Sequence, residues 1–148
     1  MKIRFILAFF IFPVFSFGQG SITQTKAVII KSISTNKAAS ILEQNDSLLS
    51  VSVKKGSSVI RHTYQFDHSG KCITETVSST CETCIDKDLA AILAINRYQW
   101  KKINENQYVS RFEDKLIIEL PVDKKDKYTI LWTDWTRTLY DLLTGNEK

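Results

Sequence analysis

The first half of the chain combines a short apolar run with strict alternation of apolar and polar residues. Residues 27–33 concentrate β-branched side chains, which predicts a strand. Residues 37–45 follow polar residues that can cap a helix, and they place Ala38, Ile41 and Leu42 on one helical face. We therefore predict a strand followed by a short helix.

Three strands are predicted next, because apolar residues alternate there with serine, threonine and charged residues. They cover residues 49–53, 60–66 and 71–78. His62 falls on the apolar face of the second of these strands, where a packed histidine is expected. The segments between the strands contain glycine and serine and predict tight turns.

The second half repeats this plan. Residues 84–99 are predicted to form a helix, because apolar side chains recur there at three- and four-residue spacing. Strands are predicted at residues 108–112, 116–122 and 128–133. The last helical stripe consists of Trp135, Leu139, Leu142 and Leu143, and Gly145 ends it. The predicted element order is β-αβββ-αβββ-α.

Strands joined by short turns favour antiparallel pairing. The prediction is thus an α+β fold, with antiparallel sheet from two helix-plus-three-strand meanders and the helices on one face. This layout resembles those of small exported PepSY-like, outer-membrane-lipoprotein-like and β-lactamase-inhibitor-like modules, and of secretion-chaperone folds. The resemblance is one of layout alone, so it implies no residue roles.

The N-terminus is typical of a signal peptide. Lys2 and Arg4 form a basic head, an apolar run of about eleven residues follows, and Ser16 and Gly18 fit a cleavage site. The run is too short to span a bilayer, which takes about twenty residues. We expect a signal peptide over 1–18, cleavage after Gly18, and export to the periplasm or the extracellular space. The mature chain is predicted to be a single domain without stable membrane insertion.

The charge of the mature chain argues against nucleic acid as a partner. Loss of Lys2 and Arg4 leaves 18 basic against 16 acidic side chains, a net charge of +2. The densest basic run, 124–127, is interrupted by Asp126 and predicts a solvated hairpin loop.

Cys72, Cys81 and Cys84 are the cysteines of the chain, and their odd number allows at most one intramolecular disulfide. Residues i and i+3 of a first helical turn have Cα atoms about 5 to 5.5 Å apart, so Cys81 and Cys84 can pair locally. Cys72 can instead pair with either of them and pin the strands to the following helix. A disulfide without a catalytic role is the leading interpretation, and inert buried thiols are another.

A redox role is the first alternative. A C-x-x-C at a helix start favours the thiolate form, so Cys81 and Cys84 are candidates for disulfide exchange. The local layout resembles a thioredoxin active site, with Pro121 in the region of that family's cis-proline. Two features differ: the preceding strand alternates instead of being uniformly apolar, and Glu82 opposes thiolate formation.

A zinc site is the second alternative. The members of this Cys3His set are His68, Cys72, Cys81 and Cys84. Against it, the C-x-x-C lacks the glycine or proline of most zinc knuckles, and an oxidising compartment favours a disulfide.

The richest aromatic cluster comprises Tyr128, Trp132 and Trp135. Such residues can form an exposed platform that binds a sugar or a partner protein. Tyr128 and Trp132 alternate along a strand, and Trp135 belongs to the last helical stripe, so burial in the core is favoured instead. One tryptophan facing solvent would reverse this preference.

No nucleophile signature or phosphate-binding loop is recognisable. We therefore expect a small exported binding or accessory protein, such as an inhibitor or immunity-type module, without catalysis or cofactor. Its expected partner is another protein or an envelope component. Disulfide exchange and zinc binding remain the alternatives from other classes.

Overall fold

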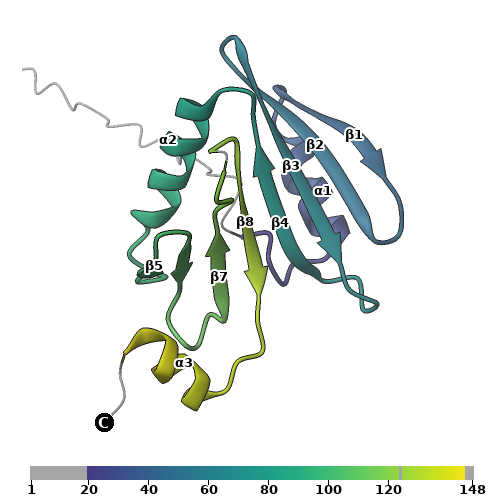
Figure 1. Cartoon of the computed structure of the whole chain (residues 1–148). Coiled ribbons are helices and arrows are strands. Elements are labelled where there is room, and N and C mark those ends of the chain that lie inside the picture. Colours follow the sequence, from purple (N-terminus) through teal and green to yellow (C-terminus); the bar gives the residue numbers. More distant parts are fainter. Residues whose placement is uncertain (1–19, 124, 146–148) are drawn as a thin grey trace, which may run out of the picture.

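The computed structural model describes residues 20–123 and 125–145, so the predicted signal peptide lies outside the described residues (Figure 1). The first part comprises α1 (Lys26–Ser34), β1 (Ala39–Gln44), β2 (Leu48–Lys55), β3 (Ser58–Phe66) and β4 (Cys72–Ser78). The second part comprises α2 (Glu82–Leu93), β5 (Lys101–Asn104), β6 (Gln107–Val109), β7 (Leu116–Glu119) and β8 (Lys127–Trp132). The last element is α3 (Arg137–Thr144). None of the helices in the described ranges is long and apolar enough to cross a membrane.

The described strands form one sheet in which every neighbouring pair is antiparallel. Its order is β1-β2-β3-β4-β8-β7-β6-β5, so each half is a meander and β4 meets β8 in the middle. The predicted α+β class is confirmed. The predicted order of elements is wrong at the start and lacks one strand in the second half, because the chain runs α-ββββ-α-ββββ-α.

The first two predicted elements have exchanged types. Residues 27–33, predicted as a strand, lie in α1, and residues 37–45, predicted as a helix, contain β1. The buried residues of α1, Ile29 and Ile33, are four positions apart, which is helical spacing. The β-branched content of the segment outweighed this spacing in the prediction. β1 is an edge strand and mostly exposed, so it carries no clear alternation.

Other boundaries differ by a few residues. Helix α2 begins at Glu82 and ends at Leu93, which leaves room for β5, a strand that was not predicted. Strand β5 is short, carries two lysines and lies at an edge of the sheet. Because little of it is buried, its sequence shows no alternation of apolar and polar residues from which a strand could be predicted. The predicted end of the last helix at Gly145 is confirmed, since this residue has φ 68° and caps α3 in the left-handed conformation.

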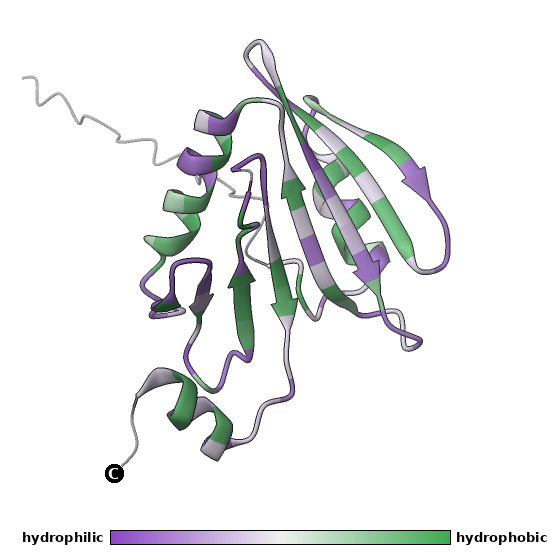
Figure 2. Cartoon of the chain, in the orientation of Figure 1, coloured by the Kyte–Doolittle hydropathy of each residue, from purple (hydrophilic) through white to green (hydrophobic). Residues whose placement is uncertain are grey.

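Two buried clusters make up most of the core. Ile29 and Ile33 of α1 pack in a cluster with side chains of β2, β3 and β4, including Leu49 and Val51. Ile85 and Ile92 of α2 pack in a second cluster with side chains of β3, β4, β7 and β8. Figure 2 shows hydrophobic residues along β7 and β8 in the middle of the sheet, and also in α1 and β2.

A polar pair lies inside this core. His62 of β3 and Glu75 of β4 are 3% and 0% exposed, and His62 Nδ1 lies 2.9 Å from Glu75 Oε1. The predicted packing of His62 is therefore confirmed. Nearby, the buried Tyr128 donates a hydrogen bond of 2.7 Å to Asp88 of α2, and Asp88 also accepts from Lys55 of β2 at 2.9 Å. These bonds tie α2 to both halves of the sheet.

We predict that Glu75→Leu lowers the free energy of unfolding by about 2–4 kcal/mol, because it removes the Glu75 partner from His62 in the core. The double variant with His62→Leu should lose less than the two single variants added together, since both polar groups are then gone. Urea unfolding of the four proteins measures this coupling.

The control is the variant Thr76→Val. Thr76 lies next to Glu75 on the other face of β4, and its hydroxyl oxygen is 3.2 Å from that of Thr129. We expect this variant to change the free energy of unfolding by less than about 1 kcal/mol. Additive losses in the double variant would show that His62 and Glu75 do not interact.

Candidate functional site

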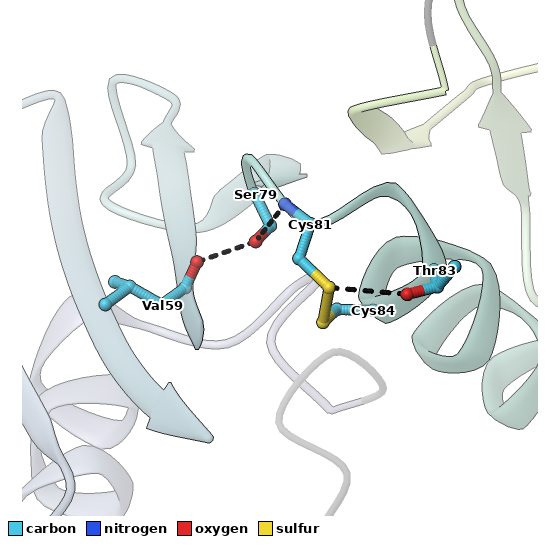
Figure 3. The surroundings of a disulfide bond; sticks show 5 residues. All are labelled: Val59, Ser79, Cys81, Thr83 and Cys84. Atoms are coloured by element: carbon cyan, nitrogen blue, oxygen red, sulfur yellow. Dashed lines mark hydrogen bonds between the residues drawn. A yellow bond between two sulfur atoms is a disulfide. The ribbon is translucent and has the colours of Figure 1, made fainter. Parts of the chain in front are cut away.

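The chain passes from β4 into α2 through a short segment that contains the C-x-x-C (Figure 3). Cys81 is the N-cap residue of α2, and it forms a disulfide with Cys84 in the first turn. Their Cα atoms are 5.2 Å apart. The pairing that the sequence left open is thus the local one.

Hydrogen bonds hold this helix start in place. The Ser79 hydroxyl donates to the Val59 carbonyl on β3 at 2.8 Å, and Ser79 Oγ accepts from the Cys81 N–H at 3.2 Å (Figure 3). The N–H groups of Cys84 and Ile85 donate to the Cys81 carbonyl at 3.0 and 3.2 Å. Because the turn is closed by backbone hydrogen bonds, the disulfide adds a covalent link to a structure that already exists.

The two sulfur atoms have different surroundings. Both cysteines are partly exposed. Cys84 packs against the core cluster that contains Ile85 and Ile92, whereas the Cys81 sulfur lies 3.5 Å from the hydroxyl of the exposed Thr83. Cys84 is therefore the cysteine of this pair that faces the core cluster.

A cavity of about 430 Å³ lies beside the helix start. Its lining consists of Val59, Arg61, Ser78, Ser79, Thr80 and Asp126. Asp126 is held by the chain, since its carbonyl accepts from the Ser79 N–H at 2.9 Å. The buried carboxylate atom Oδ1 of Asp126 has no hydrogen-bond partner within the part of the chain that the structure describes.

Cys72 is free and buried at the beginning of β4. Its thiol donates to the Thr74 carbonyl at 3.4 Å. The whole of β4, about 20 Å of extended chain, lies between Cys72 and Cys81, so these two cysteines do not meet. Burial, strengthened by the charge of Glu75, raises the pKa of the Cys72 thiol to about 12.

The alternative zinc set is not brought together. His68 lies in the exposed turn before β4, Cys72 is buried beside it, and the other two cysteines follow the far end of the strand. No group of three or more histidine, cysteine or acidic side chains suited to a metal ion occurs among the residues described.

The aromatic cluster, for which burial in the core was favoured, is divided between core and surface. Tyr128 and Trp135 are 0% and 6% exposed, whereas Trp132 is 39% exposed. The Trp132 ring borders a cavity of about 230 Å³ that also touches Lys71 and Cys72, and Lys115 Nζ lies 5.8 Å from its centroid. One tryptophan thus faces solvent, which reverses the preference for a fully buried cluster.

The leucines of the predicted helical stripe lie on α3, but they do not share the burial of Trp135. Leu139, Leu142 and Leu143 are 45%, 58% and 39% exposed. The spacing of the leucines was recognised correctly as helical, but spacing alone cannot show which side of a helix meets the protein.

Comparisons of the chain with protein-family models, with curated proteins and with solved structures find no match.

We predict that a maleimide reagent at pH 8 leaves Cys72 unmodified in the folded, unreduced protein and modifies it fully in denaturant. Burial keeps the thiol protonated and out of reach of the reagent. Mass spectrometry of peptides measures the modification. Rapid labelling of the folded protein would show that the beginning of β4 opens easily.

We also predict that the free energy of unfolding falls as the pH rises from about 9 toward 12. The folded pKa of Cys72 is about 12 against an ordinary 9.0, so the unfolded chain loses its proton first and is favoured by alkali. Burial raises the pKa values of Tyr64 and Tyr128 in the same direction. Denaturant unfolding at several pH values measures the slope.

The matched variant is Cys72→Ala, which removes one of these titrating groups. We expect the slope above pH 9 to decrease by up to about 1.4 kcal/mol per pH unit, the value for one proton. An unchanged slope would mean that Cys72 does not contribute to the alkaline loss of stability.

Proposed function

We propose that this chain is a small exported protein that acts by binding another protein through the outer surface of α3. The observation that carries the proposal is the exposed stripe of Leu139, Leu142 and Leu143. Three large apolar side chains at i, i+3 and i+4 form the pattern by which a helix enters a groove on a partner. No catalysis and no cofactor are needed for this role.

Helix α3 is fixed with its leucines outward. Tyr140 donates to the Ser110 carbonyl at 2.9 Å, and Thr144 is 6% exposed. The ring of Trp135 lies 5.4 Å from that of Tyr140. The aromatic and polar side of the helix therefore contacts the protein, and the apolar side is left for a partner.

Both ends of α3 are capped, so the helix is formed before any partner binds. Thr136 Oγ1 accepts from the Leu139 N–H at 3.3 Å, and Gly145 ends the helix. A preformed helix does not lose chain entropy on binding, which favours association.

We further infer that α1 and α2 share one face of the sheet. Four residues on neighbouring strands form one row across the sheet, in the order Val51, His62, Val77 and Tyr128. Val51 belongs to the core cluster of α1, and Tyr128 belongs to the core cluster of α2. Side chains in such a row lie on the same face. With the first two helices on this face, α3 stays apart at the end of β8.

A protein is the partner that this surface fits best. The charged residues of α3, Arg137 and Asp141, cancel, so nothing in the helix attracts an anionic membrane. Three leucines on a helix of 8 residues are also too few for a stable symmetric dimer, which buries about 800 Å² per partner. A partner with a deeper apolar groove avoids both difficulties.

We predict that a photoreactive amino acid at Leu142 forms a cross-link to another protein in cells that produce this chain. The same amino acid at the exposed Gln65 of β3 should give at least about tenfold less of that product. Adding Leu139→Asp should remove the cross-link from position 142, because a buried charge is costly in an apolar groove. The product is measured by immunoblotting.

The thermal midpoint of the Leu139→Asp protein should stay within about 2 °C of the wild type, because the side chain is already exposed. Cross-links to lipid, to a second copy of this chain, or equally from both positions would overturn the proposal.

A further inference from the structure

The disulfide at the start of α2 supports an activity that does not depend on α3. We propose that the Cys81–Cys84 disulfide exchanges with the thiols of other exported proteins and acts as an oxidant of protein dithiols. Cys81 is the sulfur that is attacked, and Cys84 is the sulfur that leaves.

Stability alone gives a weak reason for this bond. The two cysteines are 3 positions apart, and the entropic gain from a disulfide is smallest for such short loops. The turn that they enclose is already closed by the N–H groups of Cys84 and Ile85 bonding to the Cys81 carbonyl. A disulfide that can open without loss of the fold is suited to exchange.

The surroundings of the two sulfurs assign their roles. Cys84 packs on the α2 core cluster, which hinders approach of a second sulfur. Cys81 is partly exposed, and the hydroxyl Oγ1 of Thr83 lies 3.5 Å from its sulfur. Thiol attack requires access in line with the S–S bond, so the sulfur of Cys81 reacts.

The helix start stabilises the thiolate that exchange produces. Cys81 occupies the N-cap of α2, where the positive end of the helix dipole favours an anion. Thr83 can turn its hydroxyl proton toward this sulfur from 3.5 Å. Glu82 has the opposite effect, but its side chain is exposed and its charge is screened by solvent.

A binding place for the other protein lies next to Cys81. The cavity of about 430 Å³ is lined by Ser79 and Thr80, the residues that lead directly to Cys81. Val59, 45% exposed, offers an apolar contact, and Asp126, whose Oδ1 has no hydrogen-bond partner among the described residues, contributes a carboxylate to the lining. These groups suit a cysteine-containing peptide segment rather than a small free thiol.

The proposed reaction consists of two thiol–disulfide exchange steps. A client thiolate attacks Cys81 Sγ, the S–S bond breaks, and Cys84 leaves as a thiolate that takes up a proton. The second client thiolate then attacks the client sulfur of the mixed disulfide and releases Cys81 as a thiolate. Two electrons pass from the client dithiol to this protein, which ends with two thiols while the client holds a disulfide.

The test uses the mature protein in mixtures of reduced and oxidised glutathione. We expect the Cys81–Cys84 pair to change from oxidised to reduced across these mixtures, with circular dichroism unchanged. We also expect it to oxidise a synthetic peptide that carries two thiols at least about tenfold faster than oxidised glutathione at equal concentration. Mass spectrometry after thiol trapping measures both.

Two single variants test the assigned roles. With Cys84→Ser, Cys81 should accumulate a mixed disulfide with the peptide, and with Cys81→Ser the yield from Cys84 should be at least about tenfold lower. A pair that stays oxidised in every glutathione mixture, or equal yields of mixed disulfide from the two variants, would overturn the proposal.

The variant Asp126→Ala tests the cavity as the peptide site. Slower oxidation of the peptide, with the equilibrium between the Cys81–Cys84 pair and glutathione unchanged, would support this site. An unchanged rate of peptide oxidation would refute it.

Discussion

The pairing of β4 with β8 is the contact on which the rest of this structure depends. It is the place where strands distant in the sequence become neighbours, with Thr74–Ser78 aligned to Leu131–Lys127. Without it the two meanders would be separate sheets of four strands, each with an additional unpaired edge. The pairing also aligns Val77 with Tyr128, and the Tyr128 hydroxyl reaches Asp88 of α2. The sheet and the second helix are thus held by the same register.

That register also explains the buried polar pair. Glu75 lies opposite Ile130 on one side and Tyr64 on the other, so it is surrounded by strands and cannot reach water. His62, from the adjacent strand, supplies a partner within hydrogen-bond distance. A pair of this kind contributes little net stability compared with apolar residues, but it disfavours a shifted register, because a slip of two residues would leave the carboxylate buried without its partner.

The sequence predicts the central strands well and the outer elements poorly, for one physical reason. β3 and β4 are half-buried, so their apolar residues alternate, whereas β1 and β5 are exposed edges with no such pattern. The segment of α1 was assigned by its β-branched residues, although Ile29 and Ile33 had helical spacing. The C-x-x-C was placed correctly at a strand-to-helix boundary, but which cysteines pair depends on the length of β4, which separates Cys72 from the other two. The outward leucines of α3 could not be predicted, because the spacing of a stripe does not show what it faces.

The antiparallel arrangement of β4 and β8 keeps the two proposed surfaces apart. Cys81 follows the end of β4, beside the start of β8, as the bond between Ser79 and Asp126 shows. Helix α3 follows the end of β8, which lies beside the start of β4. The length of these strands therefore separates the disulfide from the leucines by about 20 Å. In the proposed complex, a compact groove that received α3 would not cover Cys81, so the disulfide would stay accessible to a second thiol-bearing chain or to an extended segment of the same partner.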